Sequence, residues 1–436
     1  MKRLFSKQEE AWSFFVSKLS KGINTIDTSS VGTGKTVVAA AIAKELDCPI
    51  AVICPKAVIP SWTRELKDMG VDDSKILFVY NFELIRRGKK PFLMKRGKKI
   101  MQWGLPKNTL VLVDEIHKCK GPYTQNCQLV ISLVQQGYRV HGMSATACED
   151  PTEMRSIGFM LGLHSLNKNE RGKKSWYSWM KSNGCYQDQW NQWRLAKRAS
   201  LENVKKSIYG VTGTKLTVQD FPDSFRDNRV FIEPIKFKDS SKIIKVYEEL
   251  GITPTIIEDY IENGTVTESE FVLVNLLRAR QLAESLKVPD MADIAQDLVD
   301  QGNSVVLFVN FKDTIEALCE KLGHSVCKRI EGGQSANERQ NIVDSFQSDD
   351  INLLAVNISA GGTGLSLHDV NGKRHRISLI SPSFNAKDHL QTLGRIHRNG
   401  AKSDAIQKIL VAADSIEEAV MKSINKKLKN LEALHG

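Results

Sequence analysis

The 436-residue sequence contains no apolar run approaching the about 20 residues that a membrane-spanning helix needs, so we expect no contact with a membrane. Its eight cysteines form no Cys-x-x-Cys pair and no compact Cys/His cluster, which argues against a zinc site and favours reduced structural thiols. The first residues are basic but lack an apolar segment followed by small residues, so we expect no signal peptide. Low-complexity segments are also absent. Together these absences predict a cytoplasmic protein.

The positive charge of the sequence is concentrated in two stretches. The net charge is +11, and residues 86–99 carry eight Lys/Arg with no acid, whereas residues 166–215 carry eleven Lys/Arg against three acids. The two stretches contribute +16 between them, which leaves the remaining chain near −5. Focused positive charge is typical of proteins that bind a polyanion, most often a nucleic acid. The alternatives are two solvated basic loops or, for the first stretch, a nuclear-import signal.

Short β-branched runs alternate with helical stretches along the whole chain, which indicates parallel sheets covered by helices on both faces. The length exceeds what one core usually holds and predicts two tandem α/β domains, residues 1–228 and 229–436, joined within residues 220–241. We expect the second basic stretch, residues 166–215, to form a basic helical insert within the first domain. The predicted strands cover residues 23–27, 50–54, 76–79, 109–113 and 139–143, then 304–309, 352–356, 376–380 and 408–412.

The stretch Ser29–Thr36, SSVGTGKT, has the composition of a phosphate-binding loop between a strand and a helix. Gly32 and Gly34, on either side of Thr33, allow a tight turn that points backbone N–H groups at phosphate oxygens. Lys35 supplies a positive charge for the phosphates, and the Thr36 hydroxyl is placed to bind Mg²⁺. Ser29 replaces the usual first glycine, which is tolerable if its φ is not positive.

A second motif, TLVLVDEIHK, places two acids at the end of an apolar strand at residues 109–113. We expect Asp114 to bind the metal and Glu115 to position and polarise the attacking water. His117 follows two residues later, where it can sense the same site. In GMSATA, Ser144 and Thr146 end another strand with hydroxyls on the same edge, which is a weak signal by itself.

The second half of the sequence carries two further candidate motifs. Residues 357–364, NISAGGTG, end a strand in a glycine-rich loop that permits close approach of the backbone to a ligand or simply makes a tight turn. In HLQTLGRIHRNG, Arg395 and Arg398 are three residues apart and share one face if the segment is helical. Two such guanidinium groups suit a transferred phosphoryl group, although an ordinary charged surface has the same pattern.

Aromatic residues accompany both basic stretches. Trp176, Trp179, Trp190 and Trp193 form two pairs with helical spacing, which predicts either two packed amphipathic helices or a surface that stacks unpaired bases. Residues 86–99 predict a basic hairpin with an apolar tip at residues 91–94, or else a solvated loop. The cations available for phosphate contacts in this stretch include Arg86, Arg87, Lys89, Lys90, Lys95 and Arg96.

Taken in order, these motifs resemble those of the superfamily 2 helicases and translocases over most of the chain. Within that superfamily, CPKAVIPSW, AGGTGLSL and GRIHRNG resemble the Snf2-like branch, and the compact size is similar to phage and bacterial branch-migration helicases of the UvsW type. The resemblance implies two RecA-like domains that use ATP and Mg²⁺. It also implies a place at the nucleoid, or in the host cytoplasm if a phage encodes the chain.

The resemblance assigns roles to individual residues. It implies that Gln8 reads the adenine, and that Gln391, Arg395 and Arg398 complete the ATP site from the second domain. Ser144 and Thr146 would couple hydrolysis to movement. The residues implied to face the nucleic-acid backbone are Lys56, Arg339, Thr363 and Gly364.

The function that we expect is an ATP-dependent DNA helicase that unwinds or branch-migrates forked or branched DNA in replication, recombination or repair. It would act as a monomer beside replication and recombination proteins. The alternatives are a duplex translocase that strips or remodels protein–DNA complexes, the motor subunit of a nuclease complex, and an ATP-gated binding module without turnover. The adjacent acids Asp114 and Glu115 speak against the last of these.

Overall fold

The computed structural model describes residues 3–87, 93–96, 100–148, 150–167, 172–196, 198–222, 224–263, 270–361 and 365–435. The chain divides into two compact units, which are residues Met1–Asp220 together with Leu431–Gly436, and residues Phe221–Asn430. We call them unit 1 and unit 2. Within the described residues, no helix combines the length and the apolar character that a membrane span requires.

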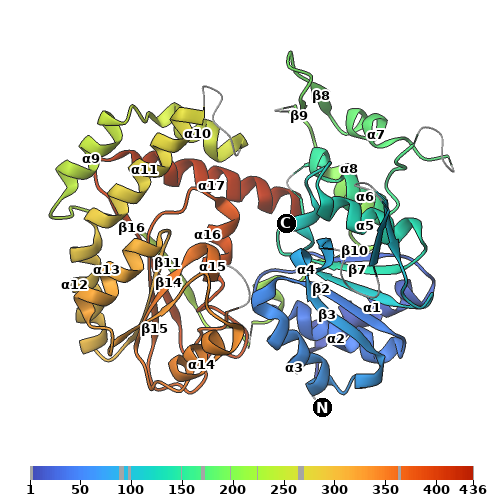
Figure 1. The fold of residues 1–436 in the computed structure, drawn as a ribbon, viewed down its shortest axis with the longest axis horizontal. Helices are drawn as coiled ribbons and strands as arrows, with labels where there is room; N and C mark the ends of the chain where they lie inside the picture. The colour runs from blue at the N-terminus through green and yellow to red at the C-terminus, as the bar shows by residue number, and fades with distance from the viewer. Residues whose placement is uncertain are drawn as a thin grey trace. The chain divides into compact units, whose positions relative to one another are not determined.

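Unit 1 is built around a parallel sheet whose described strands run in the order β10-β1-β7-β6-β2-β3. In Figure 1, α1, α2 and α3 lie to one side of this sheet, and α5 and α6 lie to the other. Its principal elements are α1 (Ser6–Ser20), β1 (Thr25–Asp27), α2 (Lys35–Leu46), β2 (Ile50–Cys54), α3 (Ile59–Met69), β3 (Ile76–Asn81), α4 (Phe82–Arg86), β4 (Leu93–Arg96), β5 (Ile100–Trp103), β6 (Leu110–Asp114), α5 (Gln125–Gln135), β7 (Arg139–Met143), α6 (Arg155–Met160), α7 (Trp176–Ser182), β8 (Cys185–Gln187), β9 (Trp193–Leu195), α8 (Glu202–Ile208) and β10 (Gly213–Thr214).

Unit 2 repeats the architecture with a parallel sheet in the order β11-β16-β15-β12-β14-β13 among its described strands. The central strands β12 and β14 are buried along their whole length, as expected of a sheet covered on both faces. The elements of unit 2 are β11 (Asn228–Ile235), α9 (Ser240–Glu249), α10 (Pro254–Asn263), α11 (Glu270–Leu286), α12 (Val288–Asp300), β12 (Ser304–Val309), α13 (Lys312–Leu322), β13 (Cys327–Ile330), α14 (Ala336–Gln347), β14 (Leu353–Asn357), α15 (Ile358–Gly361), β15 (Arg376–Ile380), α16 (Ala386–Leu393), β16 (Ala405–Ala412) and α17 (Ile416–His435).

The predicted α/β class and the predicted strands are confirmed, and the boundary between the two units, after Asp220, lies within the predicted joint at residues 220–241. Residues 228–235 form β11, an edge strand paired in parallel with β16 over its full length. Pro234 belongs to this strand, and proline is tolerated there because the N–H that it lacks is not needed on the open side of an edge. The strand was not recognised in the sequence because most of its side chains are exposed and its residues carry mixed charge.

The insert in unit 1 is only partly helical, contrary to the prediction. Trp176 and Trp179 lie on α7 and are buried, so this pair packs in the core. Trp190 and Trp193 belong instead to an antiparallel hairpin, β8–β9, whose turn is residues 188–192. Trp190 and Trp193 are three residues apart because one lies in the turn and the other begins the short strand β9. Their spacing therefore does not reflect a helix.

The first basic stretch leads into the antiparallel pair β4–β5. Leu93 and Met94 are part of β4 and so do not form the tip that the sequence suggested. Pro91, Phe92, Lys89 and Lys90 lie outside the described residues, as does the connection between the strands.

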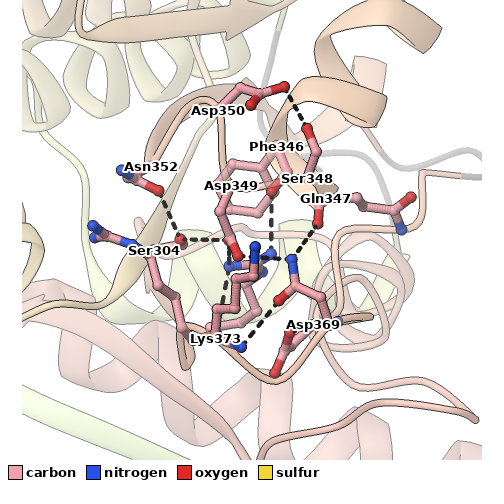
Figure 2. A network of polar contacts seen from close by, with 12 residues as sticks. Ser304, Phe346, Gln347, Ser348, Asp349, Asp350, Asn352, Asp369 and Lys373 are labelled. Atoms are coloured by element: carbon pink, nitrogen blue, oxygen red, sulfur yellow. Dashed lines mark hydrogen bonds and ion pairs between the residues drawn. The ribbon is translucent and has the colours of Figure 1, made fainter.

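A buried polar network fastens the amino ends of β12 and β15 in unit 2 (Figure 2). The guanidinium of Arg376, 1% exposed, donates to Asp349 Oδ1 at 2.6 Å and to Phe346 O at 3.1 Å. Asp349 also accepts from Asn371 Nδ2 at 2.8 Å, and Ser304 Oγ lies 3.4 Å from its Oδ1. Removing one partner of a buried ion pair costs about 3–5 kcal/mol in general. The network therefore stabilises the amino ends of these strands, whereas the candidate motifs follow the carboxyl ends.

Unit 1 contains a buried neutral histidine that makes its stability sensitive to acid. His141 on β7 is fully buried, its Nδ1 lies 2.8 Å from Thr25 Oγ1, and its ring packs against Phe15. Burial lowers the pKa of His141 to about 3, whereas the unfolded chain has the ordinary value near 6.5. The stabilisation is complete above pH 6.5 and is lost as the pH falls below it, because only the unfolded state then takes up the proton.

We predict that lowering the pH from 7.5 to 5 removes about 2 kcal/mol of unfolding free energy from unit 1 through His141. The measurement is urea unfolding at both pH values, followed by tryptophan fluorescence, because the seven tryptophans all lie between Trp12 and Trp193 and so report on unit 1. In His141→Gln the difference between the two pH values should shrink by about that amount. An unchanged pH dependence in this variant would contradict the assignment.

Candidate active site

The phosphate loop, residues 29–36, connects the end of β1 to the start of α2, as predicted. Gly34 precedes α2 with a φ of 90°, and a Cβ built there would lie 2.4 Å from Gln8 Nε2, so this position requires glycine. Gln8 Nε2 donates to Thr33 O at 2.8 Å, and Gln8 Oε1 accepts from Phe5 N at 3.0 Å. The amide is therefore held against the loop from α1, while its reading of adenine stays a prediction.

Ser29, the departure from the usual loop, has a specific structural role. Its φ is not positive, which meets the condition set from the sequence. Its backbone N–H donates to Asp27 Oδ1 at 2.9 Å, and its hydroxyl accepts from the N–H of Leu216 at 2.8 Å. A glycine could not make the second bond. The serine thus ties the loop to the segment that follows β10.

The ammonium group of Lys35 lies over the loop itself. It donates to Ser29 O at 2.7 Å and to Ser30 O at 3.0 Å. Both acceptors are loop carbonyls, whose place phosphate oxygens can take when a nucleotide binds. Asp27 lies nearby; burial raises the pKa of its carboxyl group, and the charge of Lys35 opposes that rise.

The register of the sheet brings the acidic motif beside the loop. Asp27 at the end of β1 and Asp114 at the end of β6 both pair with Met143 on β7, the strand between them. The residues that follow Asp27, Asp114 and Met143 therefore leave the sheet side by side at its carboxyl edge, the usual ligand site of such sheets. The predicted constellation of phosphate loop, Asp114 and Glu115 is assembled within unit 1.

Two contacts orient Asp114. Its Oδ2 accepts from Trp62 Nε1 at 2.8 Å, and its Oδ1 accepts from the N–H of Glu115 at 2.9 Å. Burial and the charge of Glu115 raise the pKa of Asp114 to about 6, although Lys35 opposes the rise. Trp62 was missed as a site residue. The available signal was the ring N–H that such a buried indole must satisfy, in a segment, CPKAVIPSW, already recognised as a motif.

The oxygen donors present fit Mg²⁺. The Thr36 hydroxyl and the Asp114 carboxylate are hard ligands of the kind that Mg²⁺ prefers, together with phosphate oxygens. Two adjacent carboxylates, one with a raised pKa, also gain from a nearby divalent charge. When bound, the ion would neutralise charge on the phosphates of the nucleotide.

Glu115 is connected to the strand end at Ser144 through His117. Glu115 directly follows β6 and has a left-handed φ of 53°, an uncommon conformation for a residue other than glycine. His117 Nδ1 lies 3.1 Å from Glu115 Oε2 and 3.0 Å from Ser144 Oγ. The Ser144 hydroxyl also accepts from the N–H of Thr146 at 3.2 Å. The three predicted coupling residues therefore form one chain of contacts that ends at the proposed hydrolytic carboxylate.

In unit 2, the segment that carries the two arginines is not helical, so the condition for their sharing one helical face is not met. The helix α16, which carries the buried Gln391, ends at Leu393 because Gly394 follows. Arg395 and Arg398 lie in the turn and irregular segment beyond it, where Arg398 Nε donates to Gly394 O at 3.1 Å. Burial lowers the pKa of Arg398 to about 9, and the charge of Arg395 contributes to this shift. Two neighbouring guanidinium groups in such a position favour an anion between or beside them.

The predicted nucleic-acid contacts are dispersed over several elements. Lys56 is exposed directly after β2, and Arg87 is exposed after α4. Arg86 lies 3.3 Å from Glu83, and Arg339 on α14 donates to Glu331 O at 2.7 Å. The side chains of Lys95 and Arg96 are not described, and Thr363 and Gly364 lie outside the described residues, so these assignments stay predictions.

A polar hollow at the carboxyl ends of β12, β14 and β15 was missed from the sequence. Arg280 of α11 lies in it, with its guanidinium carbon 4.3 Å from the centre of the Phe384 ring. The carboxylate of Glu284, 2% exposed, accepts from the N–H of Asn310 at 2.9 Å and so fixes the exit of β12. The signal was the set of polar residues within five positions of the strand ends, namely Asn310, Ser359, Ser383 and Asn385.

The chain is similar to known proteins. A family model described as helicase conserved C-terminal domain matches residues 287–400. The chain is 31% identical over 459 residues to the protein named "Putative ATP-dependent RNA helicase" of Acanthamoeba polyphaga mimivirus, with 99% of this chain and 84% of the relative covered.

Two further likenesses are more distant. The chain is 22% identical to the Caenorhabditis elegans homologue of SWI/SNF-related matrix-associated actin-dependent regulator of chromatin subfamily A-like protein 1, and the alignment covers 98% of this chain and 61% of that relative. The solved structure of Dbp5 from Saccharomyces cerevisiae, bound to RNA and ADP BeF3, is similar with a TM-score of 0.51 at 14% identity. That alignment covers 98% of this chain and 88% of Dbp5, and it shows a likeness of fold.

Proposed function

The chain belongs to the superfamily 2 helicases and is an ATP-hydrolysing, Snf2-type member, and from this premise we propose that it is a motor that moves on DNA. The observation that carries the proposal is the arrangement in unit 1 of Lys35, Asp114 and Glu115 at one sheet edge. It supplies the parts needed to bind and cleave a phosphoanhydride.

The roles of these residues follow from their chemistry. Lys35 holds the β- and γ-phosphates, and the loop N–H groups and the start of α2 add further positive potential. Glu115 accepts a hydrogen bond from the attacking water and polarises it toward the γ-phosphorus. Loss of that phosphate changes the contacts of Glu115, and the chain through His117 and Ser144 carries the change to the end of β7.

Unit 2 contributes the charge that hydrolysis requires. Arg395 and Arg398 are brought close by the end of α16, and their repulsion is relieved when an anion binds. We assign Arg398 to the γ-phosphate in the transition state and Gln391 to positioning of the same nucleotide. Each cycle of ATP binding, hydrolysis and product release would drive one step along a nucleic-acid backbone.

The choice of DNA rests on the Snf2-type resemblance and on the basic stretches. The Caenorhabditis elegans relative carries a chromatin-regulator name, which points to duplex DNA, whereas the mimivirus relative is named as an RNA helicase. Lys56 and Arg87 in unit 1 and the hollow around Arg280 in unit 2 provide cations and polar groups for phosphates. Forked or branched DNA is the substrate that we favour.

We predict that the ATPase rate rises most with forked and four-way DNA, less with plain duplex, and least with RNA of matched sequence. The measurement is the steady-state rate over this panel at two stated salt concentrations, because phosphate contacts make affinity fall steeply with salt. Stimulation by RNA alone would replace DNA with RNA as the substrate. Equal rates with every polynucleotide and without any would overturn the proposal.

A second candidate, duplex translocation that strips or remodels bound protein, is favoured by the Snf2-type relatives. Two assays run side by side distinguish duplex translocation from unwinding. Displacement of a strand from a fork reports unwinding, and displacement of a third strand from plain duplex reports translocation without unwinding. A protein that does only the latter is the remodelling type.

A further inference from the structure

The hairpin β8–β9 of unit 1 presents aromatic side chains to solvent. Figure 1 shows it standing out from the sheet together with α7. Trp190 at its turn is 66% exposed, Tyr177 on α7 is 44% exposed, and Tyr123 is 72% exposed. Large aromatic side chains usually bury most of their surface, so three exposed rings in one region indicate a binding surface.

Three aromatic rings of this region are linked to one another. The hydroxyls of Tyr123 and Tyr177 lie 2.8 Å apart, and the ring centre of Tyr177 lies 5.8 Å from that of Trp193 on β9. We call these three residues, together with the exposed Trp190 at the turn of the same hairpin, the aromatic ledge. Behind it, Trp176 and Trp179 are buried in the core of unit 1 and give it a firm base.

The turn that carries Trp190 is held in one conformation by hydrogen bonds. Asp188 Oδ1 accepts from the N–H of Trp190 at 3.0 Å and from that of Gln192 at 2.8 Å. Asp188 Oδ2 accepts from Arg194 Nε at 3.2 Å, and Asn191 takes the left-handed conformation that the turn needs. The indole is thus presented on an ordered turn, which lowers the conformational entropy lost when a ligand binds.

Cations lie among the rings. Lys181 Nζ lies 5.9 Å from the centre of the Trp193 ring, and the guanidinium of Arg155 lies 5.4 Å from that of Tyr123. Lys173 and Lys174 are also exposed, and neither forms an ion pair with a described residue. The acid Asp188 is already engaged by its turn and by Arg194. The surface therefore combines flat apolar faces with unbalanced positive charge.

We propose that the aromatic ledge binds the unpaired bases of single-stranded DNA, such as the strand separated at a fork. Bases inside a duplex are stacked on each other and offer no free face, whereas an unpaired base stacks on an exposed aromatic ring while nearby lysines contact its phosphates. The ledge deepens the proposed function and rests on it, because it gives the motor a contact that duplex DNA lacks.

The test compares Trp190→Ala with a matched control, Tyr186→Ala. Tyr186 is 50% exposed on the same hairpin. It pairs with Arg194, whereas Trp193 pairs with Gln187, the next residue of β8. The side chain of Tyr186 therefore points to the face of the hairpin opposite to that of Trp193. Binding of a single-stranded oligonucleotide that contains 2-aminopurine is measured without ATP, by anisotropy and by quenching of the analogue. The rate of ATP hydrolysis with blunt duplex is measured in parallel.

We expect Trp190→Ala to weaken single-strand binding about tenfold, the loss of roughly one stacked base, and to remove most of the quenching. Its ATPase rate with blunt duplex and the behaviour of Tyr186→Ala should match the wild type. Wild-type binding and quenching in Trp190→Ala would overturn the ledge, as would the absence of quenching by the wild type. A wild-type ATPase that no DNA stimulates would instead count against the proposed function, since the binding assay contains no ATP.

Discussion

Replacing Glu115 with glutamine should reduce ATP turnover by about a thousandfold while leaving ATP bound, because the amide cannot polarise the attacking water as a carboxylate does. The substitution is nearly isosteric, and His117, 3.1 Å from Glu115 Oε2, can still hydrogen-bond to the amide. The loss should therefore appear in kcat, with little change in the affinity for nucleotide. Single-turnover hydrolysis and equilibrium binding of a fluorescent ATP analogue measure the two quantities.

The control is Glu45→Gln, the same chemical change at an exposed position of α2. It should hydrolyse ATP at the wild-type rate. If Glu115→Gln kept more than a tenth of the wild-type rate, another group would have to position the water, and the role given to the acidic motif would be wrong.

Replacing Arg398 with alanine should slow hydrolysis by about a thousandfold without abolishing ATP binding, since arginines of this kind act on charge that develops in the transition state. The expected split follows from the proposed roles, because Lys35 and the loop of unit 1 are proposed to hold the phosphates, whereas Arg398 of unit 2 is proposed to act in the transition state. Arg398→Lys should recover little, because one ammonium group cannot reproduce the planar fork of a guanidinium.

The matched control here is Lys373→Ala, which removes an exposed positive charge from unit 2 near the amino ends of its strands. Its kcat should be unchanged. A loss of ATP affinity in Arg398→Ala, with kcat preserved, would make the arginine a ground-state contact and remove it from the hydrolytic step.

Much of the fold was predictable because both sheets are parallel and buried. Strands such as Ile50–Cys54 and Arg139–Met143 are short β-branched or apolar runs with distinct ends, and the motif residues follow them directly. The edge strand Asn228–Ile235 escaped prediction because it is exposed and contains Pro234. An edge strand is set by its neighbour, here β16, and its own composition carries little signal.

The residue types of the candidate site could be predicted from the sequence, but the contacts that hold those residues in place could not. A glycine-rich loop and an Asp-Glu pair after a strand specify phosphate chemistry locally, whereas the contact from Trp62 to Asp114 and that from Ser29 to Leu216 join segments distant in the chain. The same limit applies to the arginines: their spacing would place them on one face of a helix, but Gly394 ends α16 before either residue is reached. The spacing of Trp190 and Trp193 wrongly indicated a helix, because a turn followed by a short strand can give the same spacing of three residues.

The most direct test of the central claim is the ATPase rate of the wild-type chain with and without forked DNA, beside that of Lys35→Ala. Lys35 donates to the loop carbonyls that face the phosphate site, and alanine removes its charge without altering the start of α2. We expect forked DNA to raise the rate several-fold in the wild type, and we expect Lys35→Ala to lose ATP hydrolysis. A rate indifferent to DNA and retained by Lys35→Ala would contradict it.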